Sequence, residues 1–174
     1  MDWLTIREFL LDSIKFIIVI IILLFVMVYV VSITQVVGNS MDPTLKNQEV
    51  LILNKAKYRF FDVKRGDIIS FTYEDTKYLI KRVIGLPGDK IKIKDNQLYI
   101  NEKIYDEPYL KNVETKDFDL ATLGTTEVPE GKYFVLGDNR ENSLDSRKIG
   151  FVDQEDIIGK VAIRIWPINH FKFF

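Results

Sequence analysis

The sequence predicts a mainly β protein, in which one N-terminal transmembrane helix is followed by an all-β domain with a small insertion. Two observations predict this division. No residue from Phe16 to Met41 is charged, and after Val37 the chain changes to short β-type runs separated by turn residues. With 174 residues, the chain has room for one globular domain and an anchor.

The uncharged segment is long and apolar enough to cross a bilayer. Phe16–Val31 reads FIIVIIILLFVMVYVV, and a bilayer core requires about 20 apolar residues in helical form. We therefore expect a span over residues 16–37, preceded by a short N-terminal segment, residues 1–15. The run exceeds the apolar core of a cleaved signal peptide, and no Ala-x-Ala site follows it. Basic residues lie on both sides of the span, so their count does not orient it.

The rest of the chain has the pattern of a β fold. Seven short runs have β-type periodicity, and turns with Pro-Gly or Asp-Asn lie between them. Many short strands with few helix-length patterns indicate a sandwich or barrel. The more polar stretch 95–131 is expected to be an inserted subdomain. The predicted strands are Val50–Asn54, Ile68–Tyr73, Tyr78–Ile84, Lys90–Lys94, Gln97–Ile100, Lys132–Leu136 and Ile158–Trp166.

Composition argues against several classes of function. The formal net charge is -1, whereas a nucleic-acid partner requires a basic excess. The chain has no cysteine, which excludes disulfides, a cysteine nucleophile and thiolate metal sites. Its one histidine, His170, argues against a Ser-His-Asp triad and a multi-histidine metal site. We therefore expect no nucleic-acid partner, no metal and no other cofactor.

A hydrolase of this composition must activate a hydroxyl group or water with Lys, Asp or Glu. Ser40 is one candidate, because it lies between Gly38, which lets the backbone turn, and Pro43, which stiffens it. Such a turn can place a serine beside exposed N–H groups, as an oxyanion site requires. Taken alone, the motif is more often only a linker.

Lys81 is the second candidate. Side chains alternate along a strand, so Lys81 shares a face with Leu79 and Val83. Burial there would lower its pKa, and a neutral amine can take a proton from a serine hydroxyl. The commoner alternative is an edge lysine that reaches water. Arg82 lies on the opposite face and needs an acidic partner if buried, for which Asp138 is a candidate.

A third segment, Gly137–Arg147, is either a solvated loop or a hydrogen-bonded layer behind an active site. Its two serines, three acidic residues and two arginines within eleven residues allow both readings. The spacing of its acids is not that of a calcium-binding EF-hand.

Taken together and in this order, these segments resemble type I signal peptidases, also called leader peptidases. The match covers nearly the whole chain, and the single N-terminal span is similar to the compact form found in Gram-positive bacteria. Each motif is modest alone, but the ordered set is specific. The set consists of the anchor, Ser40–Thr44, Arg65–Ile68, Lys81–Asp89 and Gly137–Arg147.

The resemblance implies a membrane-bound serine endopeptidase that cleaves N-terminal signal peptides from secreted preproteins after small residues, of the Ala-x-Ala type. Ser40 would be the nucleophile and Lys81 the general base. The Ser40 N–H would form part of the oxyanion hole, but Gly38 stands where some family members have a serine hydroxyl. The supporting residues that the resemblance implies are Ser143, which would orient the lysine amine by a hydrogen bond, Asp145 and Arg147 as an ion pair, and Arg82 with Asp138.

The resemblance also implies substrate, location and partners. Family substrates bind as an extended strand, a form of β-augmentation. The peptidase domain, residues 38–174, would lie on the extracytoplasmic side of the plasma membrane, with residues 1–15 in the cytoplasm. Its partners would be preproteins and the lipid bilayer. By position, the residues expected to line the substrate pockets are Val36, Met41, Leu45, Leu79 and Ile80.

Two other functions remain open. One is a Ser/Lys peptidase of related fold that cleaves itself or one dedicated partner, although the anchor argues against a self-cleaving repressor. The other is an inactive homologue that binds preproteins, against which the intact Ser40 and Lys81 argue. The aromatic end, His170–Phe174, fits core packing and seating at the membrane interface equally well.

Overall fold

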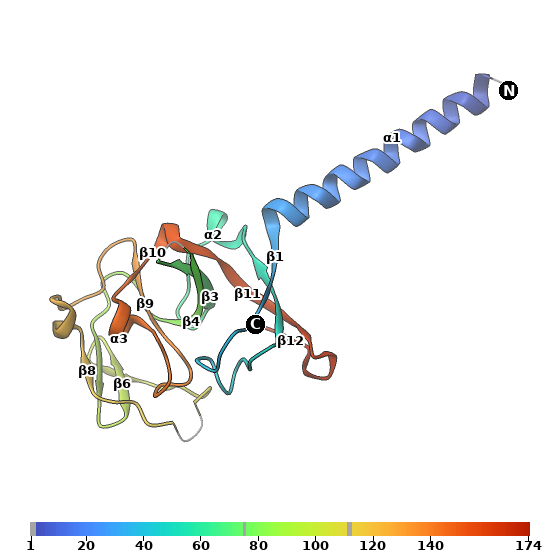
Figure 1. The fold of residues 1–174 in the computed structure, drawn as a ribbon. Helices are drawn as coiled ribbons and strands as arrows, with labels where there is room; N and C mark the ends of the chain where they lie inside the picture. The colour runs from blue at the N-terminus through green and yellow to red at the C-terminus, as the bar shows by residue number, and fades with distance from the viewer. Residues whose placement is uncertain (1–2, 75, 111–112) are drawn as a thin grey trace.

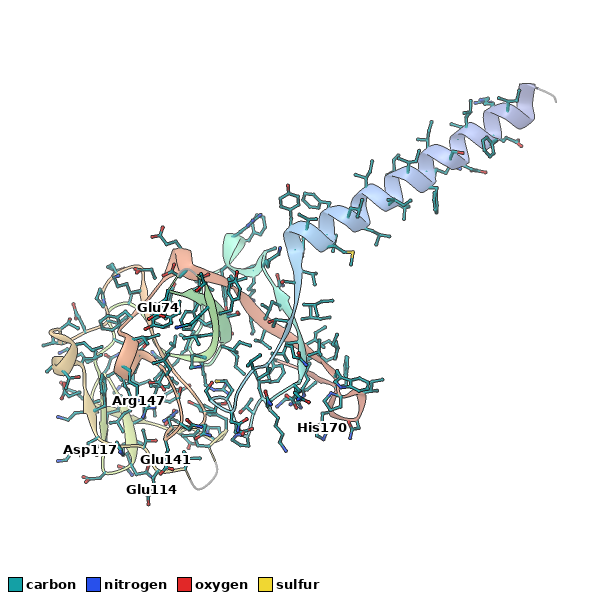
Figure 2. The ribbon with its side chains drawn as sticks, in the orientation of Figure 1. Glu74, Glu114, Asp117, Glu141, Arg147 and His170 are labelled. Carbon is teal, nitrogen blue, oxygen red and sulfur yellow. The ribbon has the colours of Figure 1, made fainter. Side chains whose placement is uncertain are left out.

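A projecting helix and a β domain make up the protein (Figure 1). The structure is a computed structural model that describes residues 3–74, 76–110 and 113–174. Helix α1 spans Trp3–Phe25, and a π-helical turn, η1 (Val26–Val30), leads from it into the first strand. The segment Ile6–Val30 is long and apolar enough to cross a membrane, and none of its hydrophobic window is buried against the β domain. Figure 2 shows its side chains projecting on all sides.

The helix ends earlier than the predicted span. Strand β1 (Val31–Gln35) pairs antiparallel with β2 (Val50–Asn54) along its whole length. The predicted end of the span at Val37 is therefore wrong. The physical reason is that Ser32 and Thr34 alternate with apolar, β-branched neighbours, a strand pattern that continues the uncharged run without a break.

The main sheet has eight strands and contains the strand that carries Lys81. Its order is β1-β2-β11-β3-β4-β9-β10, with β12 paired to β11, and the neighbouring strands are antiparallel. Strand β11 crosses the middle of the sheet and joins its two halves. The remaining strands of this sheet are β3 (Ile68–Tyr73), β4 (Lys77–Gly85), β9 (Lys132–Leu136), β10 (Val152–Asp153), β11 (Ile157–Trp166) and β12 (Lys172–Phe173).

A second sheet has four strands in the order β7-β6-β5-β8. It begins at Ile91, before the predicted start of the insertion at Asp95. It is also not separate from the main core, because its apolar side chains pack with Ile84 of β4 and with Phe134 and Leu136 of β9. Its strands are β5 (Ile91–Lys94), β6 (Gln97–Ile100), β7 (Lys103–Tyr105) and β8 (Phe118–Asp119).

The predicted fold class, mainly β with one N-terminal apolar helix, is confirmed. All seven predicted strands are present, and β2, β3, β6 and β9 have the predicted bounds. Five strands were not predicted, namely β1, β7, β8, β10 and β12. Short helical turns complete the fold: α2 (Lys57–Phe60), η2 (Leu120–Leu123), α3 (Ser146–Ile149), η3 (Gln154–Asp156) and η4 (Ile168–His170).

We predict that residues 31–174 fold without the helix, because the apolar window of α1 is not buried in the domain whereas β1 forms the edge of its main sheet. A chain that begins at Val31 should unfold cooperatively close to the melting temperature of the full chain, measured by circular dichroism in detergent. A matched chain that begins at Val36 lacks β1 and should melt at least about 4 °C lower. Loss of the transition in the longer of these two chains would show that α1 belongs to the core.

Candidate active site

Ser40 lies on a tightly held turn that follows β1. Gly38 has φ +89°, a conformation that glycine adopts without strain, and its N–H donates to Asn47 Oδ1 at 3.0 Å. On the other side of Ser40, the side chains of Met41 and Leu45 are buried in the core beside β2. The Leu45 N–H also donates to the Met41 carbonyl at 2.9 Å. The backbone that presents the serine hydroxyl is therefore fixed on both sides.

Lys81 lies in β4, and its side chain reaches Ser40. The residue is only 2% exposed. Its Nζ is 2.9 Å from Ser40 Oγ and 2.8 Å from the Ile80 carbonyl. Burial lowers the pKa of Lys81 to about 8, although the charges of Asp145 and Asp138 act in the opposite direction. A neutral amine at this distance can accept the proton of the serine hydroxyl.

Ser143 does not make the hydrogen bond to Lys81 that we predicted. Its buried Oγ has no hydrogen-bond partner in the described part of the chain, and the Ile80 carbonyl is instead the second partner of Lys81 Nζ. The Ser143 side chain packs against the backbone of Gly137, where an added Cβ would lie 2.3 Å from Ser143 Oγ. Packing within the loop therefore sets the direction of the Ser143 hydroxyl. The position of a residue in the sequence does not reveal that direction.

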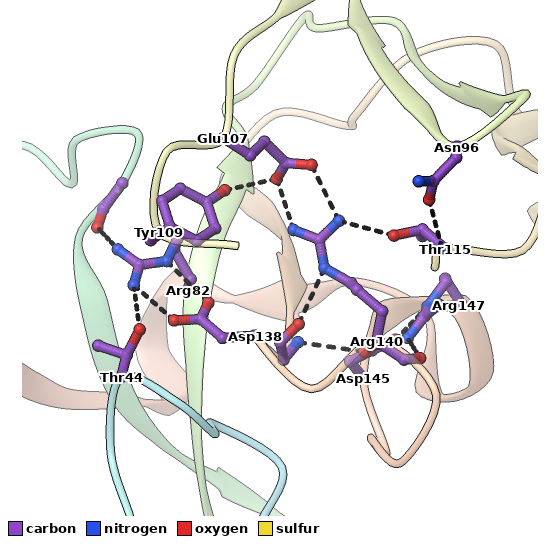
Figure 3. Close-up of polar contacts among 12 residues, drawn as sticks. Thr44, Arg82, Asn96, Glu107, Tyr109, Thr115, Asp138, Arg140, Asp145 and Arg147 are labelled. Carbon is purple, nitrogen blue, oxygen red and sulfur yellow. Dashed lines mark hydrogen bonds and ion pairs between the residues drawn. The ribbon is translucent and has the colours of Figure 1, made fainter. Parts of the chain in front are cut away.

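Arg82 binds Asp138 (Figure 3). Strand alternation directs its side chain to the face of β4 opposite Lys81. Its Nε and Nη2 donate to the two carboxylate oxygens at 2.8 and 2.6 Å. The guanidinium also lies over the ring of Tyr109, 3.8 Å from its centroid, and donates to the Gly66 carbonyl at 3.1 Å. The charge of the buried Asp138 is thus matched by a bidentate arginine.

Asp145 forms an ion pair with Arg147 of the same loop. Arg147 Nε and Nη2 donate to its carboxylate at 2.9 and 2.8 Å, and the Gly137 N–H donates at 3.1 Å. Burial alone would raise the pKa of Asp145, but the hydrogen bonds and charge of Arg147, together with the Gly137 N–H, hold that pKa below its usual value. The carboxylate is therefore ionised at neutral pH and paired with Arg147 rather than with Lys81.

A third ion pair, which the sequence pattern did not predict, supports the same loop (Figure 3). Arg140 donates through Nε to the Gly137 carbonyl at 3.0 Å, and its terminal nitrogens donate to Glu107 at 2.9 and 2.5 Å. Tyr109 donates to the same carboxylate. Glu107 lies in a polar connector of the second sheet, where no periodicity or motif indicates a role.

A cleft of about 210 Å³ lies along Ser40 and Lys81. Four of the five residues expected to line it do so: Val36, Met41, Leu79 and Ile80. Leu45 does not, because its side chain turns into the core and is 0% exposed. Residues that we did not predict also line the cleft, namely Thr34, Gln35, Val37, Ser70 and Tyr78. No cluster of three or more His, Asp or Glu that could hold a metal occurs among the described residues.

Two strand edges face this cleft. β4 pairs with β3 over Lys77–Arg82, but with β9 only over Arg82–Gly85. Its first half therefore has one edge without a partner strand in the described structure. β1 ends the main sheet and, among the described strands, pairs only with β2. Because Thr34–Val37 and Tyr78–Lys81 both line the cleft, an extended peptide can hydrogen-bond to backbone there.

The chain is similar to known proteins over most of its length. A family model described as "Signal peptidase, peptidase S26" matches residues 9–166. Signal peptidase IB of Staphylococcus aureus (strain MRSA252) is 41% identical over 149 residues, which cover 78% of each chain. Signal peptidase I of Bacillus caldolyticus is 47% identical over 145 residues, 78% of this chain and 80% of that one. The crystal structure of a signal peptidase I from Enterococcus faecalis V583 has a TM-score of 0.55 and 42% identity, covering 59% of this chain and 98% of that chain.

We predict that Gly137→Ala lowers peptide cleavage at least about 100-fold, because displacements near 1 Å can cost that much. The added Cβ would lie 2.4 Å from the Ser40 carbonyl oxygen, so the serine turn must shift. Turnover of a peptide substrate by the purified variant is the measurement. Gly124→Ala is the control for backbone strain alone, because its φ of +77° is unfavourable for alanine but its Cβ meets no atom within 4 Å. Equal activity of the two variants would contradict the close contact at Gly137.

Proposed function

The chain belongs to the signal peptidase family, peptidase S26, and from this premise we propose that it removes signal peptides from secreted preproteins with a Ser40–Lys81 dyad. The observation that carries the proposal is the 2.9 Å contact between Lys81 Nζ and Ser40 Oγ. The family is one of serine peptidases. Ser40 and Ser70 both line the cleft, and the contact joins Ser40 to Lys81, the buried amine of its lining.

The proposed reaction has two stages. In the first, neutral Lys81 takes the Ser40 proton while Oγ attacks the carbonyl carbon of the scissile bond. The lysine then gives this proton to the leaving amine, which departs as the new N-terminus of the mature protein. In the second, Lys81 removes a proton from water, which attacks the acyl-serine ester and releases the signal peptide, and the proton returns to Ser40.

The oxyanion that forms at the carbonyl needs a donor. Gly38 has no side chain to offer, and its N–H is already bonded to Asn47. We assign the role to the Ser40 N–H, which belongs to the turn held by Met41 and Leu45. A fixed backbone donor stabilises developing charge without reorganising during the reaction.

The shape of the cleft supports cleavage after small residues. A signal peptide that adds as an extended strand would place its first and third residues before the cut on one face. Val36, Met41, Leu79 and Ile80 form the apolar walls that this face would meet. The volume of about 210 Å³ must hold two side chains together with the peptide backbone between them, which favours small side chains and agrees with an Ala-x-Ala pattern.

The N-terminal helix supports a membrane location. Ile6–Val30 has the length and hydropathy of a span, and Ser40 follows it closely. We propose that residues before the span lie in the cytoplasm and that the β domain lies outside, at the membrane surface. In that position the nucleophile would meet signal peptides where they leave the bilayer.

We predict that Ser40→Ala and Lys81→Ala each reduce cleavage of a preprotein by about 10⁴-fold or more, and that the double variant is no worse than the single ones. Lys81→Arg should be equally inactive, because a guanidinium does not release its proton. The assay is conversion of a preprotein by purified enzyme in detergent. Lys94→Ala, at an exposed lysine of the second sheet, is the control. Near-normal turnover by Lys81→Ala or Lys81→Arg would disprove the dyad.

The lowered pKa of Lys81, about 8, predicts the pH dependence of the rate. Below this value the amine is mostly protonated, so kcat/KM should rise about tenfold per pH unit and level off above about pH 8 to 9. Steady-state cleavage of a peptide between pH 6 and 10 measures this profile. A rate that falls steadily from pH 6 to 9, in protein that stays folded, would contradict the assignment of Lys81 as the base.

The same shift predicts how stability depends on pH. The folded chain loses the Lys81 proton near pH 8, whereas the unfolded chain keeps it until about 10.5. Because the unfolded state binds more protons between these values, the Lys81 contribution to the free energy of unfolding should rise through that window. Below pH 8 the full cost of the buried charge is present. Denaturant unfolding of Ser40→Ala should show this rise, and Ser40→Ala with Lys81→Met should lack it. Identical curves would contradict the lowered pKa.

A further inference from the structure

An exposed aromatic and basic segment lies beside the end of the helix and belongs to neither the core nor the cleft. We call this segment, Lys55–Phe61, the juxtamembrane turn; it contains α2. Phe60 and Phe61 are 78% and 64% exposed, although phenylalanine is a residue that folding usually buries. Two adjacent exposed rings therefore indicate a surface that a membrane or another molecule covers.

The juxtamembrane turn is joined directly to the end of the helix. The Lys55 N–H donates to the carbonyl of Val30 at 2.8 Å, and the Lys55 amine bonds to the Val28 carbonyl. Figure 1 shows α2 near the point where α1 passes into β1. The position of this turn along the membrane normal is thus set by the position of Val30.

The length of the helix places Val30 at the membrane surface. Its uncharged part begins after Lys15 and ends at Val30, which gives about 22 Å at 1.5 Å per residue. The hydrocarbon core of a bilayer is about 30 Å thick. The run is shorter than this core, so the Lys15 backbone must lie inside the inner boundary with its amine extended to the headgroups, and Val30 then lies at the outer boundary. The juxtamembrane turn must then lie at headgroup depth.

The charges of the turn suit that depth. Lys57 Nζ lies 5.0 Å from the centroid of the Phe61 ring, so a cation and a ring form one surface. None of the salt bridges among the described residues involves Lys57 or Arg59. Aromatic rings favour the interface, and lysine and arginine are attracted to anionic lipid headgroups.

We propose that the juxtamembrane turn docks onto the bilayer that α1 spans, with Phe60 and Phe61 inserted at headgroup depth and Lys57 and Arg59 bound to the phosphates of anionic phospholipids. The inference rests on the proposed membrane span. It adds a second attachment to the one that β1 provides. Two attachments restrict rotation of the β domain about the helix axis, so they hold the cleft in a fixed orientation above the membrane.

Single-cysteine variants of the full chain test the proposal, because the natural sequence has no cysteine. An NBD fluorophore is attached at Phe60→Cys, at Met27→Cys in the helical span, or at Ile104→Cys; the last two sites are 67% and 63% exposed. Ile104 lies in β7 of the second sheet, and Figure 1 shows β6 and β8 of that sheet on the side of the domain away from α1. Each protein is reconstituted into vesicles of phosphatidylcholine with phosphatidylglycerol, with or without brominated lipid as quencher.

The three labels separate the docking from the span. We expect brominated lipid to quench the labels at Met27 and Phe60 at least twofold and to leave the label at Ile104 unchanged. Quenching at Met27 without quenching at Phe60 would overturn the docking and leave the span intact. Absence of quenching at Met27 would overturn the span and the docking together.

The charges are tested in the same assay. Lys57→Gln with Arg59→Gln should reduce quenching of the Phe60 label about twofold in vesicles that contain phosphatidylglycerol, and should have no effect in phosphatidylcholine alone. The matched control is Lys92→Gln with Lys94→Gln, which removes two exposed charges from the second sheet. An equal effect of the two pairs, or none from either, would overturn the binding of anionic headgroups.

Discussion

The site depends on keeping a buried lysine amine free of a carboxylate partner. Two buried carboxylates, Asp138 and Asp145, lie close enough to raise the pKa of Lys81, and burial overcomes them. It can do so because each acid is bound to an arginine: Asp138 to Arg82, and Asp145 to Arg147. A direct ion pair would instead stabilise the charged lysine and remove the base. By pairing with these two acids, Arg82 and Arg147 favour the neutral form of Lys81 without contacting it.

Strand alternation produces this arrangement from adjacent residues. Lys81 and Arg82 follow one another in β4, so one faces Ser40 and the other faces Asp138. The loop that contains Asp138 then returns to the serine, since the Asn139 N–H donates to the Ser40 carbonyl at 3.0 Å. One strand and one loop therefore position both members of the proposed dyad, and a change in the register of β4 would exchange the two side chains between faces.

Sequence reasoning succeeded where periodicity carries the signal. It predicted the strand of Lys81 and the face that the amine shares, because alternation follows from backbone geometry alone. It missed β1 because an uncharged run conceals the change from helix to strand. It misplaced Leu45 because the conformation of a turn, not its composition, directs a side chain towards core or cleft. Glu107 and Arg140 are 33 residues apart in irregular segments, and nothing local to either one indicates the other.

The Glu107–Arg140 pair explains why the second sheet is part of the active-site architecture. A buried ion pair is weak support for stability, since desolvation offsets much of its attraction, but it can specify a single geometry. Here Arg140 also holds the Gly137 carbonyl, and its own carbonyl accepts a hydrogen bond from Arg147. The connector that carries Glu107 thus restrains the loop Gly137–Arg147 from one side, and β4 restrains it from the other. Glu107, Asp138 and Asp145 each bind an arginine. Lys81 is therefore the buried basic side chain near the loop that has no carboxylate partner among the described residues.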